Sequence, residues 1–128
     1  MTGTDTGIGK TTVSCALLRA FAAQGKSVIG MKPIAAGREN GQWMDVERLL
    51  AASNVVVSRQ HVNPYAFDPS ISPHIAAQQM GAGIDLTVIH QAYRELCKHA
   101  EIVIVEGVGG FLVPVNNDQT GADLAQVL

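Results

Sequence analysis

The chain has 128 residues, which is enough for one domain with a modest core. Hydrophobic residues make up 47% of the sequence and charged residues 16%, a balance typical of soluble globular proteins. The net charge of −2 and the lack of a long apolar run argue against nucleic-acid binding, a membrane span and a signal peptide, so we expect a cytoplasmic protein.

A glycine-rich stretch over residues 3–12, with the sequence GTDTGIGKTT, is typical of a phosphate-binding loop that runs into a helix. Gly7 and Gly9 allow the tight turns that point successive backbone N–H groups at an anion. Lys10 is expected beside the β- and γ-phosphates of a nucleotide, and the Thr11 hydroxyl is expected to bind Mg²⁺. The glycine spacing is one residue longer than usual, and the alternative is a Gly/Thr-rich turn that simply caps a helix.

The loop is followed by a predicted helix over residues 10–24. Val13, Leu17 and Phe21 recur at four-residue spacing and would form its apolar face. Gly25 suits the end of this helix, because glycine readily adopts the left-handed conformation that terminates helices. The loop and helix together therefore predict the start of a nucleotide-binding unit.

A short apolar run over residues 27–31 predicts a parallel strand that ends at Lys32. A charged residue at the carboxyl end of such a strand faces the crevice where α/β folds bind ligands. After a loop, residues 43–52 predict a helix with Asp45 near its start. Lys32 and Asp45 could each also have a purely structural role. Lysines are common on solvated faces, and acidic residues commonly interact with the dipole of a first helical turn.

The middle of the chain predicts an extended segment and two helices. Residues 62–65 are extended and are interrupted by a proline. Ser72 is a suitable N-cap for a helix that continues through Gln79, since proline occupies the first helical position. Asp85 is expected to cap a longer helix.

Residues 102–105, with the sequence IVIV, are β-branched throughout and predict a strand that is buried on both faces. The strand ends in Glu106, and a carboxylate in that position is costly to bury without a cation. P-loop enzymes place an acidic residue at the end of a hydrophobic strand to hold Mg²⁺. Gly107, Gly109 and Gly110 follow and allow the backbone to lie close to a ligand. The alternative is a solvated strand end.

The two ends of the chain are unusual for such a domain. Residues 111–115 form a further apolar segment, and residues 121–128 are typical of the opening of a helix. Only Met1 and Thr2 precede the loop, where a buried strand is normal, so either the first strand is missing or the chain begins at an internal methionine. Alternating strands and helices predict an α/β, P-loop NTPase-like parallel sheet flanked by helices. We expect a partial single domain over residues 1–128 that lacks its first strand and its C-terminal part.

Four features are expected to meet at the carboxyl edge of this sheet. They are the phosphate loop, Lys32, Asp45 and Glu106. Phosphoryl transfer depends on positioning and on neutralising charge more than on covalent catalysis, and these residue types supply both.

Several segments together resemble the dethiobiotin synthetase family. They keep the order and spacing of that family across nearly the whole chain. They are the loop over residues 2–11 with its additional residue, the Lys-Pro segment over residues 31–37, the segments 62–67 and 72–74, and the second glycine-rich stretch over residues 105–110.

The resemblance implies an enzyme of biotin biosynthesis that uses ATP and CO₂ to close the ureido ring of dethiobiotin on 7,8-diaminopelargonate. One amine captures CO₂ as a carbamate, the γ-phosphate activates the carbamate as a mixed anhydride, and the second amine attacks and expels phosphate. The resemblance also implies Mg²⁺ as the cofactor and a homodimer as the assembly.

The resemblance assigns roles to individual residues. Lys10 and Lys32 are the expected catalytic residues, and Thr11, Asp45 and Glu106 are the expected Mg²⁺ ligands. The expected substrate-binding residues are Thr6, Lys32, Ala36 and Gly109. The expected ATP-binding residues are Gly7, Ile8, Gly9, Lys10, Thr11, Thr12, Asp45, Glu106, Gly107, Val108 and Gly109.

Two positions depart from the family pattern, which often carries a serine in place of Ala36 and, in some relatives, an acidic residue in place of Gly7. Other enzymes of the same P-loop class are the nearest alternatives, and two features of the sequence argue against them. Partitioning ATPases need a second lysine early in the loop, where this chain has Asp5, and cobyrinate-amidating enzymes need a glutaminase domain. A non-catalytic or partner-dependent nucleotide-binding fragment is the alternative from a different class.

Overall fold

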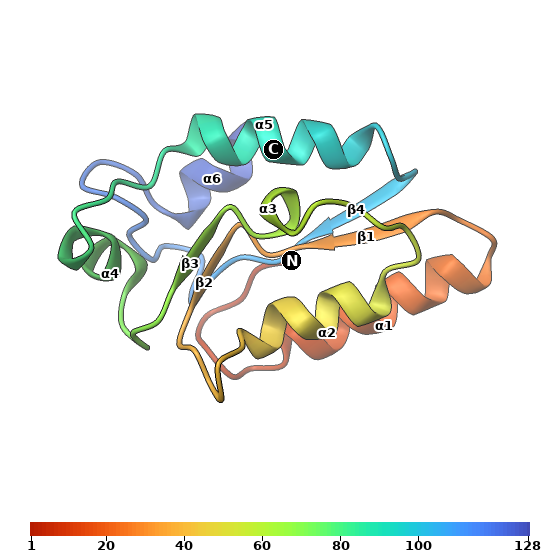
Figure 1. Ribbon diagram of the computed structural model, residues 1–128, viewed down its shortest axis with the longest axis horizontal. Helices are drawn as coiled ribbons and strands as arrows, with labels where there is room; N and C mark the ends of the chain where they lie inside the picture. The colour runs from red at the N-terminus through yellow and green to blue at the C-terminus, as the bar shows by residue number, and fades with distance from the viewer.

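The computed structural model describes residues 1–128, and its centre is a pair of parallel strands (Figure 1). Strand β1 (Val28–Met31) pairs with β4 (Ile102–Val105) in register over all four residues. Because parallel, in-register strands end at the same edge, the residues that follow them emerge side by side. Those residues are Lys32 and Glu106, so the strand pairing alone brings two charged side chains together.

Helices cover both faces of this strand pair (Figure 1). Helix α1 (Lys10–Ala23) and helix α2 (Met44–Ala52) pack on one face and against each other, and α5 (Leu86–Cys97) lies across the other face. Gly30 allows the close approach on the first face, because a Cβ there would lie 2.9 Å from atoms of both Leu18 and Leu49. This layering confirms the predicted α/β class.

A second pair of parallel strands, β2 (Ile34–Ala36) and β3 (Tyr65–Phe67), was not predicted as a sheet. The sequence analysis expected a loop after Lys32, and the structure instead resumes an extended strand directly after Pro33. Strands of three residues are too short for hydrophobic alternation to be recognised in sequence. Helix α3 (Arg59–Val62) was not predicted either, because four residues are too few for a helical apolar period to be recognised. Its last residue, Val62, was expected to be extended.

Strand β4 is less buried than the sequence predicted. Its side chains alternate between the two apolar clusters of the protein, with Val103 and Val105 against one and Ile102 and Ile104 against the other, so both faces are covered. All four residues are nevertheless only half-buried. Within the plane of the sheet, β4 pairs with β1 along one edge. Along its other edge the Met1 amino group donates to the Val105 carbonyl at 2.6 Å, and no second strand covers that edge.

The remaining helices follow their sequence signals closely. Helix α4 (Pro73–Gln79) has Ser72 at its N-cap position, and the Asp85 carboxylate accepts a hydrogen bond from the Thr87 N–H at 2.7 Å to cap α5. Helix α6 (Gly121–Val127) packs beside α5 near the C-terminus. The apolar segment over residues 111–115 forms a turn and a bend, with an isolated antiparallel bridge between Pro114 and Thr120. None of these helices is both long enough and apolar enough to cross a lipid bilayer.

Candidate functional site

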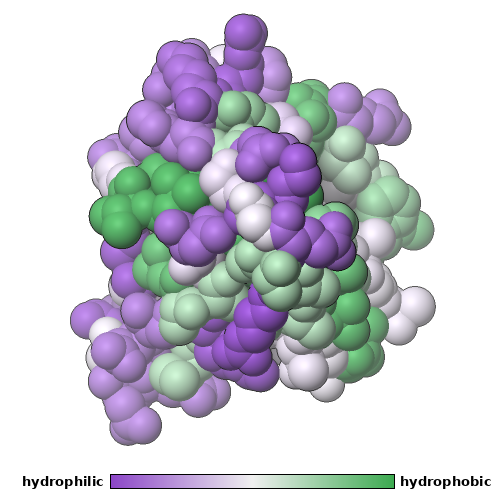
Figure 2. Space-filling model, turned by 90° about the vertical axis from the view of Figure 1, so that its right-hand side faces the viewer, coloured by the Kyte–Doolittle hydropathy of each residue, from purple (hydrophilic) through white to green (hydrophobic).

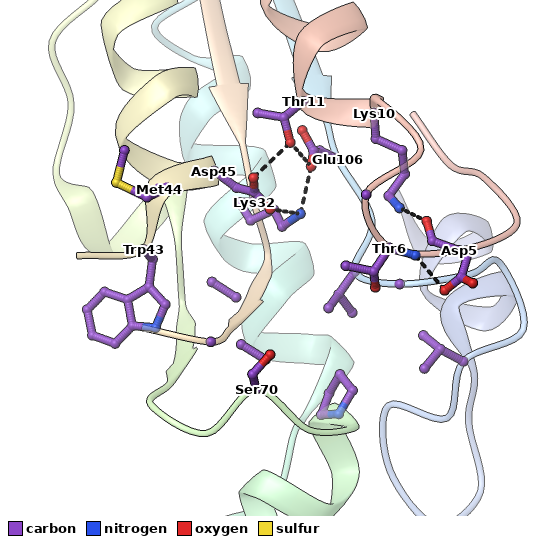
Figure 3. Close-up of a pocket in the computed structure, with 18 of the residues that line it drawn as sticks. Asp5, Thr6, Lys10, Thr11, Lys32, Trp43, Met44, Asp45, Ser70 and Glu106 are labelled. Atoms are coloured by element: carbon purple, nitrogen blue, oxygen red, sulfur yellow. Dashed lines mark hydrogen bonds and ion pairs between the residues drawn. The ribbon is translucent and has the colours of Figure 1, made fainter. Parts of the chain in front are cut away.

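The phosphate loop adopts the predicted tight turns. Gly7 and Gly9 have φ angles of 75° and 93°, in the left-handed region that favours glycine, and Gly9 is the N-cap of α1. The ammonium of Lys10 reaches back across the loop and donates to the carbonyl of Asp5 (Figure 3). The first turn of α1 therefore presents its unpaired backbone N–H groups beside a lysine, which is an arrangement suited to an anion.

The second glycine-rich stretch packs directly on this loop. The Phe111 N–H donates to the Gly3 carbonyl at 2.9 Å, and a Cβ on Gly110 would lie 2.7 Å from the Thr4 carbonyl oxygen. Gly109, with a φ angle of 56°, lies beside the Thr6 side chain. The predicted neighbours Thr6 and Gly109 are thus brought together, because only glycines permit two backbones to approach so closely.

A cluster of charged and hydroxyl groups lies between the loop and the strand ends (Figure 3). The Lys32 ammonium donates to Glu106 Oε1 at 2.6 Å and to Asp45 Oδ2 at 3.0 Å. The Thr11 hydroxyl oxygen lies 2.7 Å from Glu106 Oε1 and 2.9 Å from Asp45 Oδ1. Thr11 lies in α1 and Asp45 in α2, while Lys32 and Glu106 directly follow β1 and β4. Their meeting was expected from the sequence.

The electrostatics of this cluster leave an excess of negative charge. Lys32 and Glu106 are buried, whereas Asp45 is partly exposed. Burial raises the pKa of the Asp45 carboxyl, but the charge of Lys32, hydrogen bonds from Lys32 and Thr11, and the charge of Arg48 together outweigh it, so that the pKa lies below its usual value. Two carboxylates therefore share one ammonium.

The same cluster fits a magnesium ion. A hydroxyl carries one proton, so Thr11 can donate to only one of its two carboxylate neighbours at a time. The second oxygen of Glu106 is buried and has no hydrogen-bond partner. Mg²⁺ prefers hard oxygen ligands and is commonly held by one or two carboxylates together with phosphates. The donor set is therefore suitable, although the protein brings no third acidic, histidine or cysteine side chain to it.

These groups line one cavity of about 600 Å³. Most of the predicted site residues contribute to its wall, and two do not: the Ile8 side chain is exposed outside it, and Gly107 borders a different, apolar hollow. The predicted residues that line the cavity are Thr6, Gly7, Gly9, Lys10, Thr11, Thr12, Lys32, Ala36, Asp45, Glu106, Val108 and Gly109.

Sequence reasoning missed several residues of the cavity wall. Trp43 was not among the predicted site residues. Its Nε1 donates to the Phe67 carbonyl at 3.0 Å, and the side chain also lines the cavity. Ser70 enters from the loop after β3. Arg48 was not singled out, although a residue three positions after Asp45 on a helix lies on the same face. That spacing was the available signal.

The fold and the site together define a P-loop nucleotide-binding protein of the α/β class. A family model described as an AAA domain matches residues 1–128, and the chain belongs to this family. Curated relatives agree over its whole length. The ATP-dependent dethiobiotin synthetase BioD of Nitrosospira multiformis is 64% identical over 128 residues. The proteins of the same name from Aromatoleum aromaticum and Anaeromyxobacter are 47% and 44% identical. The chain spans 57–59% of the length of these three relatives.

Proposed function

We propose that this chain carries the phosphoryl-transfer site of an ATP-dependent dethiobiotin synthase. The observation that carries the proposal is the cluster of Lys32, Asp45, Glu106 and Thr11 beside the phosphate loop. The name shared by the three relatives supports the same activity. The enzyme would take ATP, CO₂ and 7,8-diaminopelargonate as substrates.

The reaction needs positioned charge more than a covalent catalyst. An amine of the substrate captures CO₂ as a carbamate, and a carbamate oxygen attacks the γ-phosphorus of ATP, with ADP leaving. The second amine then attacks the carbonyl carbon of the mixed anhydride and expels phosphate, which closes the ring. Lys10 would neutralise the β- and γ-phosphates, and Lys32 would hold the carbamate oxygens against the transferring phosphoryl group.

Lys32 is suited to that role by its surroundings. Its ammonium is fixed by Glu106 and Asp45, and it lines the cavity despite being almost fully buried. A lysine held in this way carries its charge in a fixed position and needs little reorganisation as negative charge develops on the substrate.

Thr11, Asp45 and Glu106 would hold Mg²⁺ in the working enzyme. The unpartnered oxygen of Glu106 supports this assignment. Bound magnesium would neutralise charge on the nucleotide phosphates.

The substrate would lie between the second glycine-rich stretch and the Lys-Pro segment. Thr6, Ala36 and Gly109 line the cavity there, and Ala36 has no hydroxyl to offer the substrate. Of the other residues assigned to ATP, Gly7, Gly9, Thr12 and Val108 line the cavity, whereas Ile8 and Gly107 do not and would act only through the backbone. A homodimer in the cytoplasm is the assembly and location that the family resemblance favours.

Phosphate release tests the proposal. Mg-ATP is supplied with and without 7,8-diaminopelargonate plus bicarbonate, to the chain and to the full-length Nitrosospira multiformis relative. We expect diamine-dependent release that the Lys10→Ala substitution abolishes. Arg19→Ala is the matched control, because Arg19 is an exposed cation on the same helix outside the cavity.

The outcomes separate the alternatives. Nucleotide binding without release, in the chain but not in the relative, would favour a nucleotide-binding unit that needs further residues for turnover. Release that does not depend on the diamine in either protein would reject the synthase assignment in favour of another P-loop ATPase.

A further inference from the structure

Three basic side chains line the cavity: Lys10, Lys32 and Arg48. The charge of Lys32 is already compensated, because its ammonium contacts two carboxylates. Lys10 and Arg48 form no ion pair with any residue of the protein. An anionic ligand in this cavity therefore meets two cations that no ion pair holds, although the charge of Arg48 also acts on Asp45. The phosphate-loop motif accounts only for Lys10.

The Arg48 guanidinium lies at the start of α1 and contacts Thr12. Its Nη2 donates to Thr12 Oγ1 at 3.3 Å, across 36 positions of sequence. Thr12 is the third residue of α1 and itself lines the cavity. A guanidinium has five N–H donors, and this is the only hydrogen bond that the Arg48 side chain makes within the protein, so its other donors remain free.

Lys10 and Arg48 approach the helix start from different sides. Figure 3 shows the Lys10 side chain directed toward Asp5 in the loop, while α2, which carries Arg48, lies on the other side of the α1 terminus. The loop lysine of such sites reaches the β- and γ-phosphates, and the loop N–H groups surround the α- and β-phosphates. Arg48 contacts Thr12, the third residue of the helix, whereas Lys10 contacts Asp5 in the loop.

Four acidic residues also line the cavity, namely Asp5, Glu39, Asp45 and Glu106. Their charge opposes the entry of a nucleotide phosphate chain unless cations offset it. A second cation beside the helix terminus lowers this repulsion and adds a planar fork of donors that matches phosphate oxygens.

We propose that Arg48 is a second phosphate-binding residue, which contacts the α- and β-phosphates of the nucleotide from the side opposite Lys10. The proposal rests on the nucleotide site proposed above and adds to it a residue outside the loop motif. Thr12 acts as the positioning residue, because its hydroxyl holds the guanidinium in place.

Binding titrations with ATP and with ADP test this proposal, using calorimetry and the fluorescence of Trp43, the one tryptophan of the chain and a residue of the cavity wall. We expect Arg48→Ala to weaken both nucleotides about tenfold, the effect of losing one charge-assisted hydrogen bond of about 1.4 kcal/mol. Arg48→Lys should recover part of the loss, since it keeps the charge without the fork. Thr12→Val should cause a smaller loss.

Arg19→Ala is the control, because it removes another exposed arginine, one that lies outside the cavity. Wild-type affinity in Arg48→Ala, together with lost affinity in Lys10→Ala, would overturn the role of Arg48 and leave the proposed function intact. Weakened ATP binding with unchanged ADP binding would place the contact at the γ-phosphate and overturn the assignment to the α- and β-phosphates. Failure of both this chain and the Nitrosospira multiformis relative to bind either nucleotide would overturn the proposed function as well.

Discussion

The two ends of the β1–β4 strand pair carry the same two residue types in opposite environments. At the amino ends, Lys26 and Glu101 form an ion pair of 2.8 Å, with side chains 48% and 51% exposed. At the carboxyl ends, Lys32 and Glu106 form an ion pair of 2.6 Å, with side chains 5% and 1% exposed. Figure 2, which faces the side of the amino ends, shows hydrophilic residues interspersed with apolar ones.

The exposed pair of Lys26 and Glu101, here called the outer pair, belongs to a group of hydrogen bonds that joins the starts of the two strands. Glu101 also accepts hydrogen bonds from the Ser27 N–H at 3.1 Å and the Ser27 hydroxyl at 3.3 Å, and the Ser27 hydroxyl accepts from the Glu101 N–H at 2.9 Å. Water screens these charges, so the pair contributes little beyond its backbone contacts. The position and contacts of the outer pair are explained by a structural role, which is to hold the starts of β1 and β4 together.

The buried pair of Lys32 and Glu106, here called the inner pair, cannot be explained by a structural role alone. Removing two charges from water costs several kcal/mol per ion, and a buried pair is often no more stable than apolar residues of similar volume. The pair is also unbalanced by Asp45, and Glu106 keeps one oxygen without a partner. Burial without full hydrogen bonding is typical of a site that serves a ligand, so the comparison supports the role proposed for Lys32 and Glu106.

The largest expected effect comes from Lys32→Met. The substitution leaves Glu106 buried without a cation, and we expect it to lower the free energy of unfolding by about 3–5 kcal/mol in urea titrations. Lys26→Met is the matched control at the other end of the same strand, and its effect should be much smaller. Equal losses in the two variants would contradict the role of burial.

A double substitution sharpens the same comparison. Lys32→Met combined with Glu106→Met replaces the whole pair by apolar side chains of similar volume. No buried charge then lacks a partner, and only the half-exposed Asp45 loses its contact with Lys32. We expect the double variant to recover about 2 kcal/mol or more of the loss seen in Lys32→Met. Losses that simply add would show that the two side chains stabilise the protein independently.

Asp45→Asn should have an intermediate effect on stability. Asp45 accepts hydrogen bonds from Lys32, but it is partly exposed, so we expect a loss of about 1 kcal/mol in the same urea titrations. A loss as large as that of Lys32→Met would break the expected gradation with burial.

The smallest expected effect is the pH dependence of the stability that Glu101 of the outer pair contributes. Hydrogen bonds from Lys26 and Ser27 hold the pKa of Glu101 below its usual value. Glu101 therefore contributes stability that is present above the pKa of the unfolded chain, near 4.3, and that is lost as the pH falls through the lower pKa of the folded state. We expect Glu101→Gln to be less stable than the wild type at pH 7 and nearly equal to it at pH 2.

Thermal unfolding scans at pH values from 2 to 7 measure this convergence, and added salt should reduce the difference at pH 7. A constant difference between the two proteins across that range would contradict the assignment to the charge of Glu101.

Much of the fold follows from local sequence. The loop motif and the Asp85 cap each act within a few residues of chain, and the structure confirms them. Helix α1 forms as predicted, but its predicted apolar face is wrong, because Val13 and Leu17 are exposed. The helix instead buries Ser14, Cys15 and Leu18, since its packing against α2 and the strands decides which side faces the core. The β-branched run of β4 correctly indicated a strand with apolar residues on both faces. Its degree of burial was predicted wrongly, because burial depends on what lies beside a strand and not on its own residues.

The sequence by itself determined the class of the site, because a phosphate loop and charged residues that end two parallel strands must meet at one edge of the sheet. Only the tertiary structure decided the contacts within it. Lys32 meets Glu106 across 74 positions, and Arg48 meets Thr12 across 36. Such contacts depend on how α2 packs against α1 and on which strand lies beside which. No local pattern encodes those distances, since they result from the packing of the whole core.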